Sequence, residues 1–481
     1  MAFDFGASSG RAIIGAFDGA KIALKEIHRF DNNPVFLRGT YYWDFLNLYH
    51  ETLNGLSAGR ESGFDSIGVD TWGVDFGLLD KNGDLMQNPV HYRDARTKGM
   101  AAELQEKAGL DLYMRTGIET MEINTIFQLY ALAKHRPDMI SQASCALLMP
   151  DLFGYFLTGV RTAEYSIAST TQMLKAGSGQ WDDELAAVAG IRGDLFPDVV
   201  LPGAELGALL PGIQRELNLG GARVISVAGH DTESAIAAVP ACDEDFFYIS
   251  CGTWSLMGTE LKAPIINQDT ARMAVTNEGG YGGKIAFLKN LAGMWLLQET
   301  RRQYIREGKD YSFPELGELA MAERPFAYLI DPDAGEFAAP GDLPGRIREY
   351  CIRTGQGAPE RPGEVARCIY ESTALRYREV FDGISALTGK EYGRVHMVGG
   401  GTKAEILCQM TANALGRELA AGASETTAIG NIAVQLISLG EISGLSEARA
   451  LTRASFPETI YSPKDERAWS EALEKFRSLV L

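Results

Sequence analysis

The segment from Arg223 to Pro240, RVISVAGHDTESAIAAVP, brings a carboxylate, an imidazole and a hydroxyl together after an apolar run. Val224 to Val227 has the β-branched composition of a buried strand, and Glu233 to Val239 has the small residues of a packed helix. The turn between them puts Asp231 at a helix N-terminus, where unpaired backbone N–H groups favour anions. Such a carboxylate accepts a proton from a bound hydroxyl while the amides hold a phosphate. On this segment alone, an ordinary helix cap explains the pattern as well.

Three turns rich in Gly, Ser and Thr follow predicted strands: Gly6 to Gly10, Gly252-Thr253 and Gly399 to Gly401. Glycine lets the backbone approach phosphate oxygens closely, and small hydroxyls add donors. One such turn is only a hairpin, but matching turns in two halves of a chain are typical of a site that holds a triphosphate between them. The chain contains no G-x-x-x-x-G-K-[ST] motif, which excludes a Walker-type NTPase.

The third turn also fits another enzyme class. Gly399 to Ala404, GGGTKA, matches G-x-G-x-x-A between a strand and a helix, as in dinucleotide-binding folds. The motif comes late in the chain, however, and no acidic residue ends the next predicted strand, because Glu418 precedes the apolar Leu419-Ala420. A dinucleotide-binding fold is therefore the weaker interpretation.

A carboxylate at Asp4 ends the first predicted strand just before the first turn. It is well placed to hold Mg²⁺ through water, because Mg²⁺ keeps several of its waters in proteins. An Asx-turn accounts for Asp4 equally well in isolation.

Trp72, Asp75, Asp94 and Arg96 combine an aromatic face with fixed hydrogen-bonding groups. Sugars are bound by such mixtures, with CH groups on the ring and hydroxyls on the carboxylates and guanidinium. The alternative for these residues is a surface salt bridge and a core tryptophan.

The elements that position these residues repeat along the chain. DFGASSGRAIIGAF near the start and YISCGTWSLMGTEL after Pro240 are both an apolar run, a small-residue turn and a second apolar run. Each half later has a lone strand that ends in glycine, SIGVDTWG and RVHMVGGG. This duplication predicts two similar domains, residues 1–240 and 241–481, that face a central cleft.

The remaining patterns predict further elements. A helix is expected from Trp43 to Leu56, and further helices after Thr97 up to about residue 158. Another helix is expected to begin at about Leu291, and a last one covers the tail from Ser462 to Leu481. The six cysteines show no C-x-x-C spacing, which argues against a Cys/His metal site. Cys351 and Cys368 lie on two predicted helices that an antiparallel packing brings together, either as free thiols or as a bridge.

Composition narrows the possible partners. The chain has 481 residues, of which 46% are hydrophobic and 22% charged, with a net charge of −18. That balance argues against nucleic acid and anionic membranes as partners. The start, MAFDFGASSG, has neither the basic nor the apolar region of a signal peptide, and no apolar run reaches spanning length. A cytoplasmic protein is expected.

Read together, seven motifs resemble those of the FGGY family of carbohydrate kinases over nearly the whole chain. They are DFGASSGR, DTWGVDF, YRDART, GHDT, SCGTWSLMG, NEGG with LKNLAGMWLLQE, and HMVGGG. The resemblance implies an α/β fold of the actin/Hsp70/sugar-kinase (ribonuclease H-like) type. It also implies ATP-dependent phosphorylation with Mg²⁺. DTWGVDF and GHDTESA are more similar to members that act on L-rhamnulose than to those for glycerol or D-xylulose, which implies transfer to O1.

The same resemblance assigns roles to individual residues. Asp231 matches the catalytic base, with His230 and Thr232 beside it at the sugar. Gly73 and Asn290 match sugar-side positions. The expected ATP contacts are Ala7, Ser8, Ser9, Gly10 and Arg11 in the first phosphate loop, Thr253 in the second, and Gln298 and Gly400.

Two alternatives share this resemblance. A kinase for another ketose, such as L-fuculose, would use the same phosphate chemistry. A non-catalytic ATP-dependent switch of the same fold would need no sugar, and Trp72, Asp94 and Arg96 argue against it. The expected partners are therefore a small sugar and ATP, with the chain as a monomer or small homo-oligomer.

Overall fold

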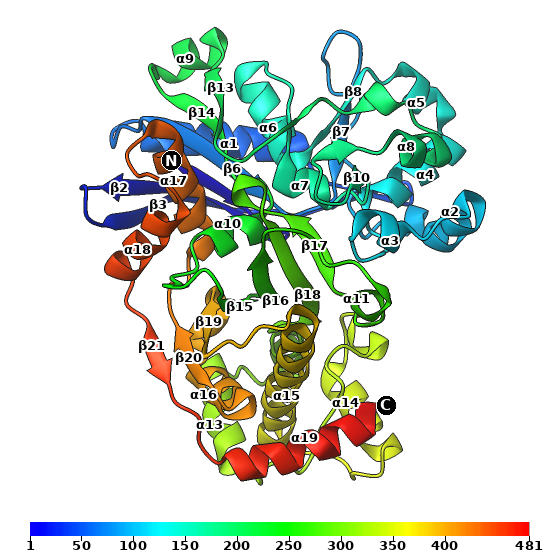
Figure 1. Cartoon of the computed structure of the whole chain (residues 1–481), viewed down its shortest axis with the longest axis vertical. Coiled ribbons are helices and arrows are strands. Elements are labelled where there is room, and N and C mark those ends of the chain that lie inside the picture. The colour runs from blue at the N-terminus through cyan, green and yellow to red at the C-terminus, as the bar shows by residue number, and fades with distance from the viewer. Residues whose placement is uncertain (481) are drawn as a thin grey trace. The chain divides into compact units, whose positions relative to one another are not determined.

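Two compact units share the chain in the computed structural model, which describes residues 1–480 (Figure 1). The first unit joins Met1–Cys242, Glu260–Phe287 and Thr426–Ser455, and the second joins Asp243–Thr259, Leu288–Glu425 and the segment from Phe456 onward. The first unit thus includes two segments from the second half of the sequence. The division into domains 1–240 and 241–481 stays a prediction.

A six-stranded mixed sheet forms the centre of the first unit, in the order β13-β14-β6-β1-β2-β3. Strand β1 pairs antiparallel with β2 and parallel with β6, which in turn pairs parallel with β14. All residues of β1 and β6 are buried, as expected for strands covered on both faces. The bounds are β1 Ala2–Phe5, β2 Ser9–Phe17, β3 Ile22–Asp31, β6 Ser66–Thr71, β13 Ala204–Ala208 and β14 Arg223–Ser226.

A seven-stranded sheet repeats this plan in the order β17-β18-β16-β15-β19-β20-β21. Here β15 pairs antiparallel with β16 and parallel with β19, β19 pairs parallel with β20, and β20 pairs antiparallel with β21. The first sheet has the same four orientations in the corresponding pairs, so the duplication predicted from the sequence is present in the topology. The bounds are β15 Phe247–Cys251, β16 Trp254–Leu261, β17 Thr276–Gly279, β18 Ile285–Ala292, β19 Arg394–Val398, β20 Glu418–Ala421 and β21 Thr459–Tyr461.

The parallel pairing of the first sheet collects three motifs at one edge. The carboxyl ends of β1, β6 and β14 lie side by side, because Phe5 pairs with Thr71 and Thr71 forms a bridge with His230. Ligands of open α/β sheets bind where parallel strands end. The first glycine turn, the DTWG segment and the GHDT turn are therefore neighbours within one unit.

Helices cover both faces of the first sheet and build a separate helical region around α4 (Figure 1). Rings of Phe5, Phe45 and Phe153 form the core beneath the sheet, with centroids 4.5 and 4.9 Å from Phe153. The helices with bounds in the first unit are α1 Phe45–Gly59, α2 Met100–Ala108, α3 Leu112–Thr116, α4 Thr125–His135, α5 Pro137–Gln142, α6 Met149–Thr158, α7 Tyr165–Ser169, α8 Asp183–Ala189, α9 Pro211–Leu217, α10 Asp231–Ala237, α11 Gln268–Arg272, α17 Thr426–Leu439 and α18 Leu445–Ser455, with short 3-10 turns at Ala95–Thr97, Gly193–Leu195 and Tyr281–Gly283.

The small sheets of the first unit connect these helices. They pair β4 with β5, β7 with β8, β9 with β12, and β10 with β11. The bounds are β4 Val35–Leu37, β5 Thr40–Tyr42, β7 Phe76–Leu79, β8 Cys145–Leu148, β9 Ala163–Glu164, β10 Leu174–Lys175, β11 Gln180–Trp181 and β12 Val199–Val200.

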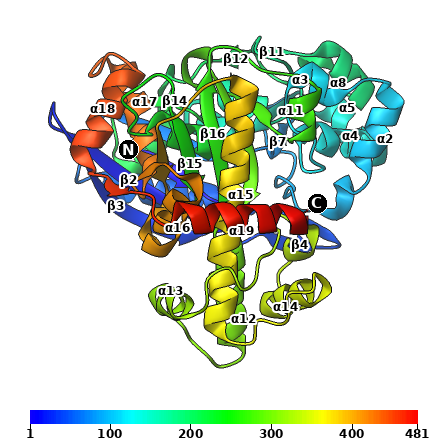
Figure 2. The same ribbon diagram turned by 60° about the horizontal axis from the view of Figure 1, so that its bottom comes forward.

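The second unit packs its helices around α15, Pro362–Thr388, which is 27 residues long. Helices α13 and α16 contact its sides, and Figure 2 shows α19 lying across it. The other bounds are α12 Trp295–Arg306, α13 Phe313–Ala322, α14 Leu343–Arg353, α16 Glu405–Leu415 and α19 Glu466–Val480, with 3-10 turns at Gly335–Phe337 and Gly400–Lys403.

Short parts of two segments predicted as helical are strands in the structure. Residues up to Ala292 form β18, so α12 begins only at Trp295, after the turn at Gly293-Met294. Likewise β8 interrupts the segment predicted as helices up to residue 158 and pairs with the distant β7. In both cases tertiary pairing decides between strand and helix for a short apolar run.

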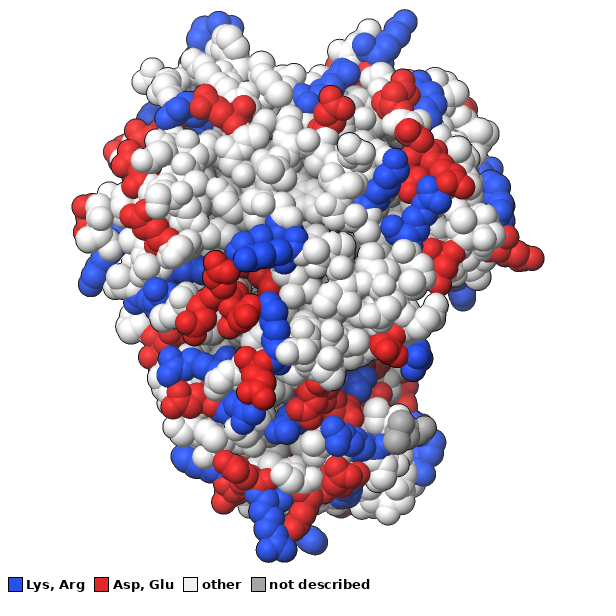
Figure 3. All heavy atoms as spheres, viewed as in Figure 1, with Lys and Arg blue, Asp and Glu red and all other residues white. Residues whose placement is uncertain are grey.

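Three further features compare with what the sequence predicts: the state of the cysteines, the apolar length of the helices and the charges on the surface. All six cysteines are free, and a hydrogen bond from Cys368 lowers the pKa of Cys351. No helix among residues 1–480 is long and apolar enough to cross a membrane. Figure 3 shows acidic and basic side chains intermixed on the visible face.

Candidate active site

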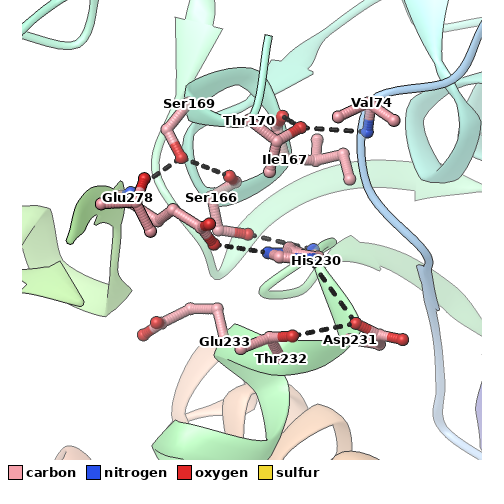
Figure 4. Close-up of polar contacts among 12 residues, drawn as sticks. Val74, Ser166, Ile167, Ser169, Thr170, His230, Asp231, Thr232, Glu233 and Glu278 are labelled. Carbon is pink, nitrogen blue, oxygen red and sulfur yellow. Dashed lines mark hydrogen bonds and ion pairs between the residues drawn. The ribbon is translucent and has the colours of Figure 1, made fainter. Parts of the chain in front are cut away.

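Asp231 is the first residue of α10 and follows the turn that leaves β14. Its side chain is 34% exposed, which leaves the carboxylate open to a ligand. Oδ1 accepts a hydrogen bond from the Thr232 hydroxyl at 3.2 Å and lies 3.6 Å from Nε2 of His230 (Figure 4). Burial and the charge of Asp4 raise the pKa of Asp231, whereas His230 lowers it. Asp231 therefore has the exposure and the basicity of a proton acceptor.

His230 lies between two carboxylates. Its Nδ1 is 3.0 Å from Oε2 of Glu278 on β17, and only 12% of its side chain is exposed. Burial lowers the pKa of His230, but Glu278, Asp231 and Glu233 together raise it to about 9. The neighbouring carboxylates therefore favour the protonated form of the ring.

A buried carboxylate, Glu164, holds the GHDT turn in place. It accepts hydrogen bonds from the backbone N–H of Gly229 at 2.9 Å and from the N–H and hydroxyl of Ser166 at 2.8 and 2.5 Å. The Ser166 hydroxyl in turn accepts from the N–H of His230 at 3.1 Å. A Cβ at Gly229 would lie 2.9 Å from Pro150, so glycine is required for this close approach.

The DTWG segment approaches His230 at Gly73. A Cβ on Gly73 would lie 3.4 Å from Nε2 of His230, so its backbone faces the ring. The next residue, Val74, has φ of 65°, a strained conformation for a β-branched residue. The N–H of Val74 donates to Oγ1 of Thr170 at 3.1 Å, and the C=O of Val74 accepts from the hydroxyl of Thr125 at 2.6 Å. These two hydrogen bonds stabilise the strained backbone. Strained backbone of this kind is typical of functional sites.

The first glycine turn, residues 6–10, leads from β1 into β2. The N–H of Gly6 donates to the C=O of Ser9 at 2.9 Å, and Asn32 donates to the C=O of Gly6 at 2.9 Å. Ala7 and Ser8 at the tip are exposed. Gly10 is buried against Phe30, where a Cβ would lie 2.3 Å from the ring.

Acidic residues gather beside this turn. Asp4 forms an ion pair with Arg11, its partner across the hairpin, and its other partner in the register is Asp70 on β6. Asp70 is fully buried and accepts from Asn431 at 2.5 Å. Burial, Asp4 and Asp231 all raise the pKa of Asp70 well above its usual range.

The residues predicted to bind a sugar by their chemistry already have protein partners. The buried Trp72 donates from Nε1 to Asp75 at 3.0 Å, as does Trp43 at 2.6 Å. Asp94 caps the 3-10 turn by accepting from the N–H of Arg96 at 3.0 Å, and Arg96 donates to Gln128 at 2.6 Å. Contact of Trp72, Asp94 and Arg96 with a sugar stays a prediction.

In the second unit, the predicted ATP contacts lie around the end of β15. Thr253 donates from its hydroxyl to Oε1 of Gln298 at 3.3 Å, and its C=O accepts from the N–H of Trp295 at 3.0 Å. The turn with Gly400 packs against the same strand, because a Cβ at Gly401 would lie 2.2 Å from Sγ of Cys251. Asn290 is half-buried on β18.

Three residues that contact this site were not predicted as site residues: Glu164, Ser166 and Glu278. They lie 48 to 66 residues away from His230 in the sequence, and no local spacing connects them. Only Glu278 carried a signal, as part of the NEGG motif.

Comparison with known proteins covers nearly the entire chain. The sequence profile of the FGGY carbohydrate kinase N-terminal domain matches residues 1–238, and that of the C-terminal domain matches 247–439. A rhamnulokinase of Bacteroides thetaiotaomicron is 43% identical over 483 residues, which is 100% of this chain and 99% of the relative. The rhamnulokinase of Bacillus subtilis is 36% identical and covers 100% of this chain and 98% of the relative.

Solved structures show the fold. Ligand-bound xylulose kinase from Lactobacillus acidophilus has a TM-score of 0.84 at 14% identity, covering 100% of this chain and 98% of that one. Plasmodium falciparum glycerol kinase with ADP has a TM-score of 0.79 at 14% identity, covering 99% and 96%. The predicted sugar-kinase fold is confirmed, and the GGGTKA turn lies inside the C-terminal kinase domain rather than in a dinucleotide-binding fold. This chain belongs to the FGGY family of carbohydrate kinases.

Proposed function

We propose that the protein transfers the γ-phosphoryl group of ATP to O1 of L-rhamnulose. The observation that carries this substrate is full-length identity of 36 to 43% with proteins named rhamnulokinase. The structural neighbours that act on xylulose or glycerol share the fold at only 14 to 18% identity. The sequence motifs DTWGVDF and GHDTESA, which resemble those of members that act on L-rhamnulose, support the same substrate.

Asp231 is the proposed general base. The sugar hydroxyl attacks in line with the leaving ADP, and charge spreads over the γ-phosphoryl oxygens, so positioning and electrostatics supply most of the acceleration. A base that takes the hydroxyl proton contributes about 10²–10⁴-fold. The open side of the Asp231 carboxylate supports this role.

Three of the proposed sugar contacts lie beside this base or beside His230. His230 and Thr232 flank Asp231, and the backbone of Gly73 faces the His230 ring. Asn290 is a further proposed contact, as are Trp72, Asp94 and Arg96 if the sugar reaches beyond Gly73.

The proposed contacts with the nucleotide are two loops and two further residues. Ala7, Ser8, Ser9, Gly10 and Arg11 form the first phosphate loop and Thr253 lies in the second, with Gln298 and Gly400 as further contacts. The exposure of the two loop tips and the hydrogen bond between Thr253 and Gln298 support this assignment.

The residues present fit a magnesium ion that is held mainly by phosphate and water. Asp4 raises the pKa of both Asp70 and Asp231, and Asp231 raises that of Asp70, so negative charge gathers here that a divalent cation offsets. No cluster of three potential ligands exists among residues 1–480, in line with an ion that keeps most of its waters. Asp4 would hold it through water, and the bound ion would neutralise charge on the phosphates.

An ADP-release assay with Mg-ATP and a panel of ketoses tests the proposal. The panel is L-rhamnulose, L-fuculose, L-ribulose and D-xylulose, with glycerol as a further acceptor. We expect the highest kcat/KM on L-rhamnulose and a product that carries phosphate on O1. A clear preference for another acceptor contradicts the substrate, and slow ATP hydrolysis that no acceptor stimulates contradicts the kinase.

A further inference from the structure

Glu278 reaches the candidate active site from a strand far along the chain. It lies on β17 and is 8% exposed, with its carboxylate directed at the His230 ring (Figure 4). The strand is held against α7, because the N–H of Gly279 donates to Ser169 at 2.8 Å. A Cβ at Gly279 would lie 2.7 Å from the Tyr165 ring, so the backbone of the strand lies close against α7. The position of Glu278 is therefore fixed by the backbone.

Both ring nitrogens of His230 face a carboxylate. Nδ1 is 3.0 Å from Glu278, and Nε2 is 3.6 Å from Asp231. A neutral imidazole carries a proton on only one nitrogen, so the other would direct a lone pair at a carboxylate oxygen. Only the doubly protonated ring presents a donor to both.

The surrounding charges support the same state. Glu278 on β17 and Asp231 and Glu233 on α10 raise the pKa of His230 to about 9, against the effect of burial. Three other acids lie near this turn. Glu164 accepts hydrogen bonds from Gly229 and Ser166. Asp4 raises the pKa of Asp231, and Asp231 in turn raises the pKa of Asp70.

We propose that Glu278 is a positioning residue that keeps His230 doubly protonated, with its Nε2–H turned toward the carboxylate of Asp231. This inference rests on the proposed function, in which Asp231 is the base. The imidazolium opposes the negative charges around Asp231 and favours the ionised form of that carboxylate. It also presents a fixed positive donor where the proposed sugar hydroxyls bind.

The substitution Glu278→Gln removes the charge and keeps the shape. A Gln amide can donate to Nδ1 of a neutral ring, so the ring orientation is retained while its proton is lost. We expect the pKa of His230 to fall by about one to three pH units. Because a neutral ring offers no positive donor to the sugar hydroxyls or to Asp231, the basic limb of kcat/KM should move to lower pH by about the same one to three units.

Glu233→Gln is the matched control. Glu233 is a second buried acid on α10, but its side chain points away from the His230 ring (Figure 4). Of the three acids that raise the pKa of His230, Glu233 has the smallest effect, so the substitution removes a nearby buried acid that does not face the ring. We expect this variant to leave the titration of His230 within about half a pH unit of the unsubstituted protein.

NMR of protein labelled at the histidine rings gives the first readout, with the His230 signal assigned from its loss in His230→Asn. A fall confined to E278Q supports the proposal. It is overturned if His230 of the unsubstituted protein titrates near 6.5, if E278Q leaves that titration unchanged, or if E233Q moves it equally.

The pH profile of kcat/KM gives the second readout, measured on the best acceptor of the ketose panel. A lowered His230 titration with an unmoved basic limb overturns the role of the imidazolium beside Asp231. If no acceptor is phosphorylated, the proposed function fails, but the NMR titration still decides whether Glu278 controls His230.

Discussion

The helix that carries Asp231 depends on one glycine of α17. A Cβ on Gly430 would lie 1.7 Å from the backbone O of Ser234 and 2.7 Å from its carbonyl carbon, whereas ordinary contact begins at 3.4 Å. The obstacle is the backbone of α10, which cannot rotate away as a side chain would. Gly430→Ala therefore forces α10 and α17 apart by up to about 1.7 Å, the difference between these distances.

The expected loss of stability is modest because two effects oppose each other. Overpacking of this kind costs about 1–3 kcal/mol, and replacing a helical glycine with alanine returns up to about 1 kcal/mol. The effect on turnover is larger, because Asp231 begins the displaced helix and a misplacement of about 1 Å costs roughly 10²-fold in rate. We expect G430A to lose about 1–2 kcal/mol of unfolding free energy and about 10²-fold in kcat.

Urea unfolding and ADP-release kinetics measure the two effects separately. Gly212→Ala is the control, because Gly212 lies within α9 and a Cβ there meets nothing within 4 Å. We expect G212A to be at least as stable as the unsubstituted protein and equally active. Wild-type kcat and stability in G430A would refute the close seating of α10 on α17.

Three further predictions concern buried or reacting carboxylates. Glu164→Gln turns an NH₂ toward the N–H of Gly229 and should lower the unfolding free energy by about 1–3 kcal/mol in urea titrations; unchanged stability would contradict the role of Glu164 in the turn. Burial raises the pKa of Asp75 to about 6 from 3.8, so its contribution to stability is fully present below about pH 3.8 and is lost as pH rises through 6. Asp75→Asn should abolish this loss, which amounts to about 3 kcal/mol of unfolding free energy. If the unfolding free energies of the two proteins differ by the same amount at pH 4.5 and at pH 7, the prediction is contradicted. Asp231→Asn should keep sugar binding, measured by calorimetry, and lose about 10²–10⁴-fold in kcat; near-normal kcat would contradict its assignment as the base.

The local parts of the site could be predicted from the sequence. A β-branched run followed by GHDT and small residues predicts strand, turn and helix, and the structure places β14 and α10 there. The strand predicted within RVHMVGGG is present as β19, Arg394–Val398. These segments are predictable because strand composition and turn residues act over a few neighbours.

The long-range parts could not be predicted in the same way. A short apolar run fits a strand or a buried helix, and at Leu291 the pairing of β18 in its sheet decides. The contact between Glu278 and His230 joins residues 48 apart in sequence, and it depends on how closely β17 packs on α7. No spacing rule encodes that packing.

The charges of the first unit explain why the proposed base needs a cation beside it. Asp4 and Asp70 lie on adjacent strands, and Asp4 raises the pKa of both Asp70 and Asp231. The charge of Asp4 favours proton uptake by the base, but it also repels the phosphates that must approach it. Positive groups have to balance both effects, and the structure provides His230 on one side of Asp231 and Arg11 against Asp4. A base surrounded by acids is therefore suited to a substrate that brings a divalent cation with its phosphates.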